Sequence, residues 1–96
     1  MDLAAFIKIQ KAVAEPNRLE IIEVIRQLDS GDGIQCANVL DRLDVAQSTF
    51  SHHISELMGA GLINGQKEGR CMLLSVNQPV IEEYLIELKS KILGQK

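Results

Sequence analysis

Helical spacing of apolar residues, interrupted at short intervals, is the feature that most limits how this 96-residue chain can fold. Glu15-Pro16 breaks the first run, because the residue before a proline disfavours helical backbone. The sequence Asp-Ser-Gly-Asp-Gly at 29–33 breaks the second run. We expect helices over residues 2–14, 16–28, 37–43, 46–59 and 77–92. Such short helices must pack around a shared core to be stable.

Two short segments have the composition of strands and not of helices. Residues 62–66 and 71–76 are joined by Lys67-Glu68-Gly69-Arg70, whose glycine and charges are typical of an exposed hairpin tip. The fold class is therefore mainly α with a small β-hairpin (α+β). Residues 1–96 are expected to form a single domain, because 96 residues leave no room for a second core. With only 3% aromatic residues, that core gains from self-association.

The helix expected over residues 46–59 has two different faces. Its apolar face carries Phe50, Ile54, Leu57 and Met58. The opposite face and the helix start carry the short polar residues Gln47, Ser48, Thr49, Ser51, His52 and Ser55. A solvated face normally carries glutamate and lysine, whereas short hydroxyls, an amide and an imidazole fit between phosphates and reach base edges in the major groove. A plain solvent-facing role for these residues is the alternative.

The order of the elements is that of a winged helix-turn-helix: a short helix, a tight turn, a helix with a small-polar face, then a hairpin with Arg70 at its tip. Four segments resemble the ArsR family of bacterial transcriptional regulators, over about residues 12–76. They are Ala-Glu-Pro-Asn-Arg-Leu at 14–19, Val-Ala-Gln-Ser-Thr-Phe-Ser-His-His-Ile at 45–54, Gly-Leu-Ile at 61–63 and Glu-Gly-Arg at 68–70.

This resemblance implies a homodimeric repressor that binds double-stranded DNA at a pseudo-palindromic operator, with one recognition helix from each protomer in the major groove. The implied DNA-contacting residues are Gln47, Ser48, Thr49, Ser51, His52, Ser55, Lys67 and Arg70. The first and last helices would form the dimer interface, through Leu3, Phe6, Ile7, Ile81, Tyr84, Leu85, Leu88 and Ile92.

The sequence departs from the family at the positions that bind metals in many relatives. Cys36 falls between the usual two cysteine positions, and the last helix offers only glutamates as hard ligands. We therefore expect no metal and no cofactor. The alternative signal is a thiol switch, in which Cys36 has a lowered pKa near a helix N-terminus and Cys71 is its possible partner.

Two further residues of the recognition segment, Ala46 and His53, bear on how its helix starts and packs. Ala46 stands where relatives often have a capping serine, a loss of about 1 kcal/mol unless Asp44 or Ser48 caps the helix instead. His53 falls on a flank of the helix, where a structural role is as reasonable as a DNA contact.

Charge leaves one competing function open. The net charge is −3, which suits a winged helix used as a protein-interaction module without specific DNA binding. An enzyme is not expected. The sequence has cysteines and histidines, but it has no glycine-rich phosphate loop or paired carboxylates that would complete an active site. No apolar run approaches the roughly 18 residues of a membrane span, so we expect a cytoplasmic protein.

Overall fold

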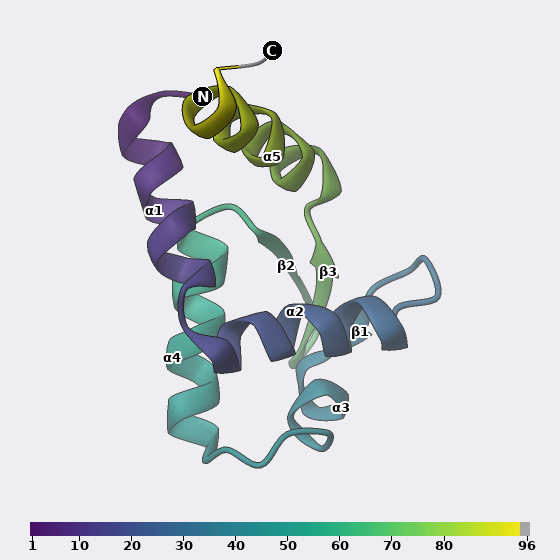
Figure 1. The fold of residues 1–96 in the computed structure, drawn as a ribbon. Helices are drawn as coiled ribbons and strands as arrows, with labels where there is room; N and C mark the ends of the chain where they lie inside the picture. Colours follow the sequence, from purple (N-terminus) through teal and green to yellow (C-terminus); the bar gives the residue numbers. More distant parts are fainter. Residues whose placement is uncertain (95–96) are drawn as a thin grey trace.

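The computed structural model describes residues 1–94, which form five helices and a three-stranded antiparallel sheet (Figure 1). In chain order the elements are α1 (Leu3–Val13), α2 (Pro16–Leu28), β1 (Ile34–Gln35), α3 (Cys36–Leu40), α4 (Gln47–Gly59), β2 (Ile63–Glu68), β3 (Cys71–Val76) and α5 (Gln78–Leu93). This arrangement confirms the mainly helical α+β fold with a hairpin wing.

The helix starts follow local capping chemistry. The Asp2 side chain accepts a hydrogen bond from the Ala5 backbone N–H at 2.8 Å, which satisfies one free donor at the start of α1. Glu15 does the same for α2, accepting from the Arg18 N–H at 3.1 Å, and Pro16 takes the first helical position, where no N–H is needed. The predicted break at residues 15–16 is therefore a helix-to-helix junction.

The sheet contains one strand more than the sequence predicted. β2 and β3 pair from Ile63 opposite Val76 to Glu68 opposite Cys71. This leaves a two-residue loop in which Gly69 has a φ of 64°, a conformation that favours glycine. The additional strand β1 pairs Ile34 with Leu74 on the other edge of β3.

The core lies where α2 crosses the middle of the molecule in Figure 1, between the other helices and the sheet. Ile21 and Ile25 of α2 are almost completely buried. Around them lie buried residues of α1, α3, α4, β2, β3 and α5, including Ile9, Val39, Leu57, Ile63 and Leu74. This shared cluster fixes α4 relative to the wing.

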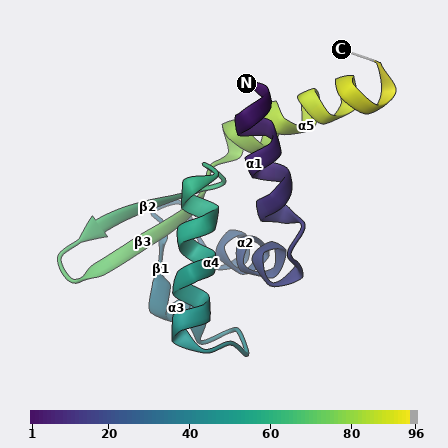
Figure 2. The ribbon, with the colours of Figure 1, turned by 90° about the vertical axis from the view of Figure 1, so that its left-hand side faces the viewer.

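The helices expected to form the dimer interface lie at the opposite end of the fold from the start of the helix expected to contact DNA. Figures 1 and 2 show α1 and α5 together at one end, with α3 and the start of α4 at the other. The β2–β3 hairpin extends sideways from the body, next to α4 (Figure 2). Within residues 1–94, no helix combines the length and apolar character needed to cross a membrane.

Candidate nucleic-acid interface

The helix before α4 is shorter than the sequence predicted, and turns follow it. α3 ends at Leu40, three residues before the predicted end. The chain then continues through two hydrogen-bonded turns, in which the Arg42 N–H donates to the Val39 carbonyl at 3.1 Å and the Leu43 N–H to the Leu40 carbonyl at 3.0 Å. These turns lead directly into α4, as in a helix-turn-helix.

The structure places α4 with its apolar side in the core and its small polar side outside. Phe50, Ile54 and Leu57 are buried. The residues predicted for the outer side are all exposed, and we call them the polar face: Gln47, Ser48, Thr49, Ser51, His52 and Ser55. A single side of one helix therefore presents hydroxyl, amide and imidazole groups to an incoming molecule.

The N-terminus of α4 is open. Its N-cap residue is Ala46, and no side chain caps it, so neither Asp44 nor Ser48 replaces the missing serine. The backbone N–H groups of the first turn are thus free to bind an anion such as a phosphate, which the helix dipole favours there.

His53, for which the sequence left a structural role and a DNA contact open, has a structural role. Its side chain is buried, with 7% of the residue exposed. Nδ1 accepts a hydrogen bond from Arg18 Nε at 3.2 Å, and Nε2 lies 3.7 Å from Glu15 Oε2. Because arginine only donates, Nδ1 is the acceptor in this bond, and the ring proton is assigned to Nε2. His53 thus joins α4 to the start of α2.

No periodicity within α4 could have revealed this contact, because Arg18 and His53 are 35 residues apart in the chain. The available signal was the segment at residues 14–19, in which a glutamate and an arginine flank a helix start beside Pro16. Both side chains face the recognition segment in the folded chain.

The wing carries two exposed, positively charged side chains. Lys67 and Arg70 are both exposed, Lys67 within β2 and Arg70 in the two-residue loop. The sequence placed Lys67 in the hairpin tip, but the structure places it within the strand, where pairing opposite Met72 fixes its direction. These two cationic side chains thus lie on the hairpin, whereas the polar face itself contains no lysine or arginine.

The surface predicted for dimerisation is partly corrected by the structure. Phe6 and Tyr84 are buried within the single chain, at 4% and 8% exposure, with ring centroids 5.2 Å apart. They join α1 to α5 and offer almost no area to a second copy. Ile81 and Leu88 are half-buried. Large apolar side chains on α1 and α5 that are exposed are Leu3, Ile7, Leu85, Ile86, Ile92 and Leu93.

Neither cysteine has the environment expected of a reactive thiol pair. Cys36 and Cys71 are both free thiols. Cys36 is half-buried, and this burial raises the pKa of its thiol instead of lowering it, so the expected helix-terminus effect is outweighed by desolvation. Cys71 is exposed on the wing. Within residues 1–94, no three histidine, cysteine, aspartate or glutamate side chains are grouped for a metal ion.

Comparisons with known proteins agree with this geometry. Residues 13–66 match the model of a helix-turn-helix domain family. An uncharacterised helix-turn-helix transcriptional regulator of Bacillus subtilis is 30% identical over 78 residues, which are 81% of this chain and 76% of that protein. An arsenical resistance operon repressor of Staphylococcus xylosus is 28% identical over 74 residues, covering 77% of this chain and 67% of the repressor.

Solved structures described as ArsR-family regulators share the fold. One is the solution structure of a homodimeric winged helix-turn-helix DNA-binding domain from Mycobacterium bovis, described as a possible ArsR-family regulator. It has a TM-score of 0.72 and 19% identity, over 93% of this chain and 81% of that one. The architecture is thus that of a winged helix-turn-helix protein.

The family match extends from the end of α1 to the middle of β2 and so includes the whole α3–turn–α4 unit. This chain belongs to the helix-turn-helix domain family, and its resemblance to the ArsR-type regulators is confirmed. The matched relatives are transcription regulators and not enzymes.

Proposed function

We propose that this protein is a sequence-specific DNA-binding repressor that acts as a homodimer on an inverted-repeat operator. The observation that carries the proposal is the polar face of α4, which is fully exposed beside an uncapped helix N-terminus. Short polar groups on a helix read base edges in the major groove, and free N–H groups at a helix start bind phosphate.

The positions of the charged residues suggest different roles for α4 and the wing in DNA binding. On the polar face, Gln47 and Ser51 offer an amide and a hydroxyl that suit hydrogen bonds to bases. On the wing, Arg70 and Lys67 have the charge and exposure that suit phosphates or the minor groove. We therefore assign sequence preference to α4 and overall affinity to the wing.

Dimerisation supplies the second half-site. The exposed apolar residues of α1 and α5 lie at the end of the fold opposite α3 and the start of α4, so a second copy bound there leaves both polar faces free (Figures 1 and 2). Two-fold symmetry then requires a pseudo-palindromic site, with half-sites about one DNA turn, or roughly 34 Å, apart. We place this activity in the cytoplasm and assign it no cofactor, metal or catalytic step.

The test is selection of duplex DNA by the purified protein from a random library, followed by titration of the selected duplex at several salt concentrations. A symmetric motif is expected. If the dimer contacts about four phosphates, affinity should fall about 100-fold between roughly 50 and 200 mM salt. A protein-interaction module would select no motif and show no salt-dependent duplex affinity, and either result would overturn the proposal.

Two variants separate the assigned roles. Arg70→Ala should weaken binding to selected and unrelated duplexes alike and lower the salt slope by about 1 per protomer, whereas Arg70→Lys, which keeps the charge, should retain the slope. Gln47→Ala should instead reduce discrimination at one base position, by roughly tenfold. If Arg70→Ala binds like the parent, the wing does not contact DNA.

A further inference from the structure

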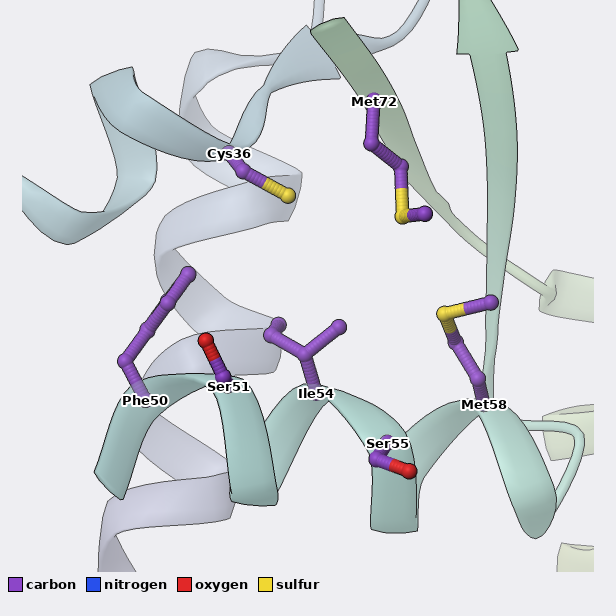
Figure 3. Close-up of a pocket in the computed structure, with 7 residues that line it drawn as sticks. All are labelled: Cys36, Phe50, Ser51, Ile54, Ser55, Met58 and Met72. Carbon is purple, nitrogen blue, oxygen red and sulfur yellow. The ribbon is translucent and has the colours of Figure 1, made fainter. Parts of the chain in front are cut away.

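A hollow of about 420 Å³ opens between α4 and the elements opposite it (Figure 3). Phe50, Ile54 and Met58 of α4 face Met72 of β3 across it, and Cys36 lies at the start of α3 beside them. Ser51 and Ser55 of the polar face complete the lining. We call this space, defined by these seven residues, the thioether pocket.

Sulfur is concentrated in this pocket. The chain has three methionines, and the two that follow Met1 both line it, together with the half-buried thiol of Cys36. Figure 3 shows the three sulfur atoms directed toward the shared opening. Thioethers are polarisable and flexible, and they make favourable contacts with aromatic rings. The lining therefore favours a ligand with an aromatic face and adapts to its shape.

Gly65 of β2 lets the two thioethers come together behind the opening. A Cβ atom at this position would lie 2.9 Å from Met58 Sδ, 2.7 Å from Met58 Cε and 3.1 Å from Met72 Sδ. Any side chain at Gly65 would push both methionine ends from their present positions. Gly65 therefore determines where the two methionine ends lie, although it does not itself line the pocket.

The pocket is unsuited to ions. None of its seven lining residues is ionised at neutral pH, since burial raises the pKa of Cys36 and keeps that thiol protonated. A charged ligand would lose hydration without gaining a partner. The polar groups at hand are the hydroxyls of Ser51 and Ser55, which suit one hydroxyl of a ligand. The volume is near the lower end of the range for small-molecule sites, about 300–1,000 Å³.

We propose that the thioether pocket binds a flat, uncharged aromatic molecule of one or two rings that carries a hydroxyl group. Its rings lie between Phe50 and the thioethers of Met58 and Met72, and its hydroxyl bonds to Ser51 or Ser55. Because these serines also belong to the polar face, a bound ligand competes with DNA for them. This coupling rests on the proposed function, whereas ligand binding itself does not.

The direct test is NMR of the full chain with ¹³C-labelled methionine methyl groups, titrated with 2-naphthol. The spectrum contains three methyl signals, so Met1, which does not line the pocket, is an internal control. Saturable shifts of Met58 and Met72 with Met1 unchanged are expected, and weaker shifts with naphthalene and with charged 2-naphthoate. Equal shifts of all three signals, or no shifts, would refute the site. Shifts with silver ions but not with naphthol would make it a soft-metal site and overturn the proposal.

Gly65→Ala is the matched variant, since it displaces the ends of both thioethers without changing the identity of any lining residue. Naphthol affinity should fall about tenfold, because the sulfur–ring contacts are disturbed. The control is Gly59→Ala at the end of α4, where a Cβ would make only ordinary contact with Lys8. Neither glycine has a positive φ, so alanine fits both backbones. Parent-like naphthol binding in a folded Gly65→Ala protein would contradict the proposal.

Coupling to DNA is measured separately, by fluorescence anisotropy with a duplex selected by the parent protein. Naphthol at a concentration near its Kd for the parent should weaken duplex binding in the parent and in Gly59→Ala, but much less in Gly65→Ala, whose occupancy is then low. Unchanged duplex affinity at full occupancy would refute the coupling. If no duplex binds, the proposed function fails while the methyl shifts still decide whether the pocket binds its ligand.

Discussion

At the scale of single residues, Ala46 is the clearest position where stability competes with the proposed DNA contact. It is the N-cap of the recognition helix and contributes no side-chain acceptor. Ala46→Ser should raise the free energy of unfolding by about 1 kcal/mol, because the serine hydroxyl can accept from an N–H of the first turn. Urea denaturation measures this difference.

The control is Ala5→Ser, the same chemical change inside α1, which should lower stability by about 0.5 kcal/mol or less. If Ala46→Ser gains nothing over this control, the start of α4 is not limited by its cap. The added hydroxyl should also weaken DNA binding somewhat, since it occupies an N–H group that we assign to phosphate.

The two cysteines should differ in reactivity. Burial raises the pKa of Cys36 above that of an ordinary cysteine thiol, so its reactive thiolate is scarce at neutral pH. In single-thiol variants, Cys71→Ser and Cys36→Ser, alkylation at pH 7.5 should be much slower for the remaining Cys36 than for the exposed Cys71. Equal rates would restore Cys36 as a candidate redox sensor.

At the scale of elements, the helices were predictable because each has its own apolar period and a local start or stop. The predicted 46–59 segment differs from α4 by one residue at its start, and the predicted 71–76 strand is β3. β1 was not predictable, because two residues carry no period and Ile34 is a strand only through its pairing with Leu74. The predicted third helix extended too far, since residues 39–43 keep helix-like spacing while the backbone bonds from Arg42 and Leu43 span three residues instead of four.

Some features of the candidate site were predictable from the sequence, and others were not. The polar face was predictable from the absence of long charged side chains over two turns of one helix. The burial of His53 was not, because it depends on a partner in another element. The roles of Phe6 and Tyr84 were misassigned, because an apolar stripe does not reveal whether it faces the chain's own core or a second copy.

The contact between α2 and α4 gives a prediction at this scale. Arg18→Ala removes the donor to the buried Nδ1 of His53 and should cost about 1–3 kcal/mol of stability, since that nitrogen is left without a partner. Thermal unfolding monitored by circular dichroism gives the cost. Arg26→Ala, an exposed arginine on the same helix, should stay within about 0.5 kcal/mol of the parent.

A spectroscopic readout distinguishes this contact from general packing. Imidazole ¹⁵N shifts of the parent should show an unprotonated Nδ1 and a protonated Nε2 for His53, and the Nδ1 shift should move in Arg18→Ala. A protonated Nδ1 in the parent protein would contradict the bond from Arg18.

At the scale of the whole molecule, exposed apolar area indicates where a second copy would bind. Leu85 and Ile86 of α5 are 54% and 62% exposed, and Leu3 of α1 is 63% exposed. Phe6 and Tyr84 support this end of the fold from beneath by joining the two helices. A small domain gains stability by covering such residues with an identical surface.

Leu85→Glu should therefore convert the proposed dimer to a monomer, because its interface would bury two uncompensated carboxylates. Sedimentation velocity at micromolar concentration gives the assembly state. The matched control is Leu19→Glu, which places the same charge at a leucine of similar exposure, 51%, but on α2. It should remain dimeric. A monomeric Leu85→Glu protein should also bind the selected duplex at least about tenfold more weakly, since it contacts one half-site at a time. Dissociation by Leu19→Glu instead of Leu85→Glu would move the dimer interface from α1 and α5 to α2.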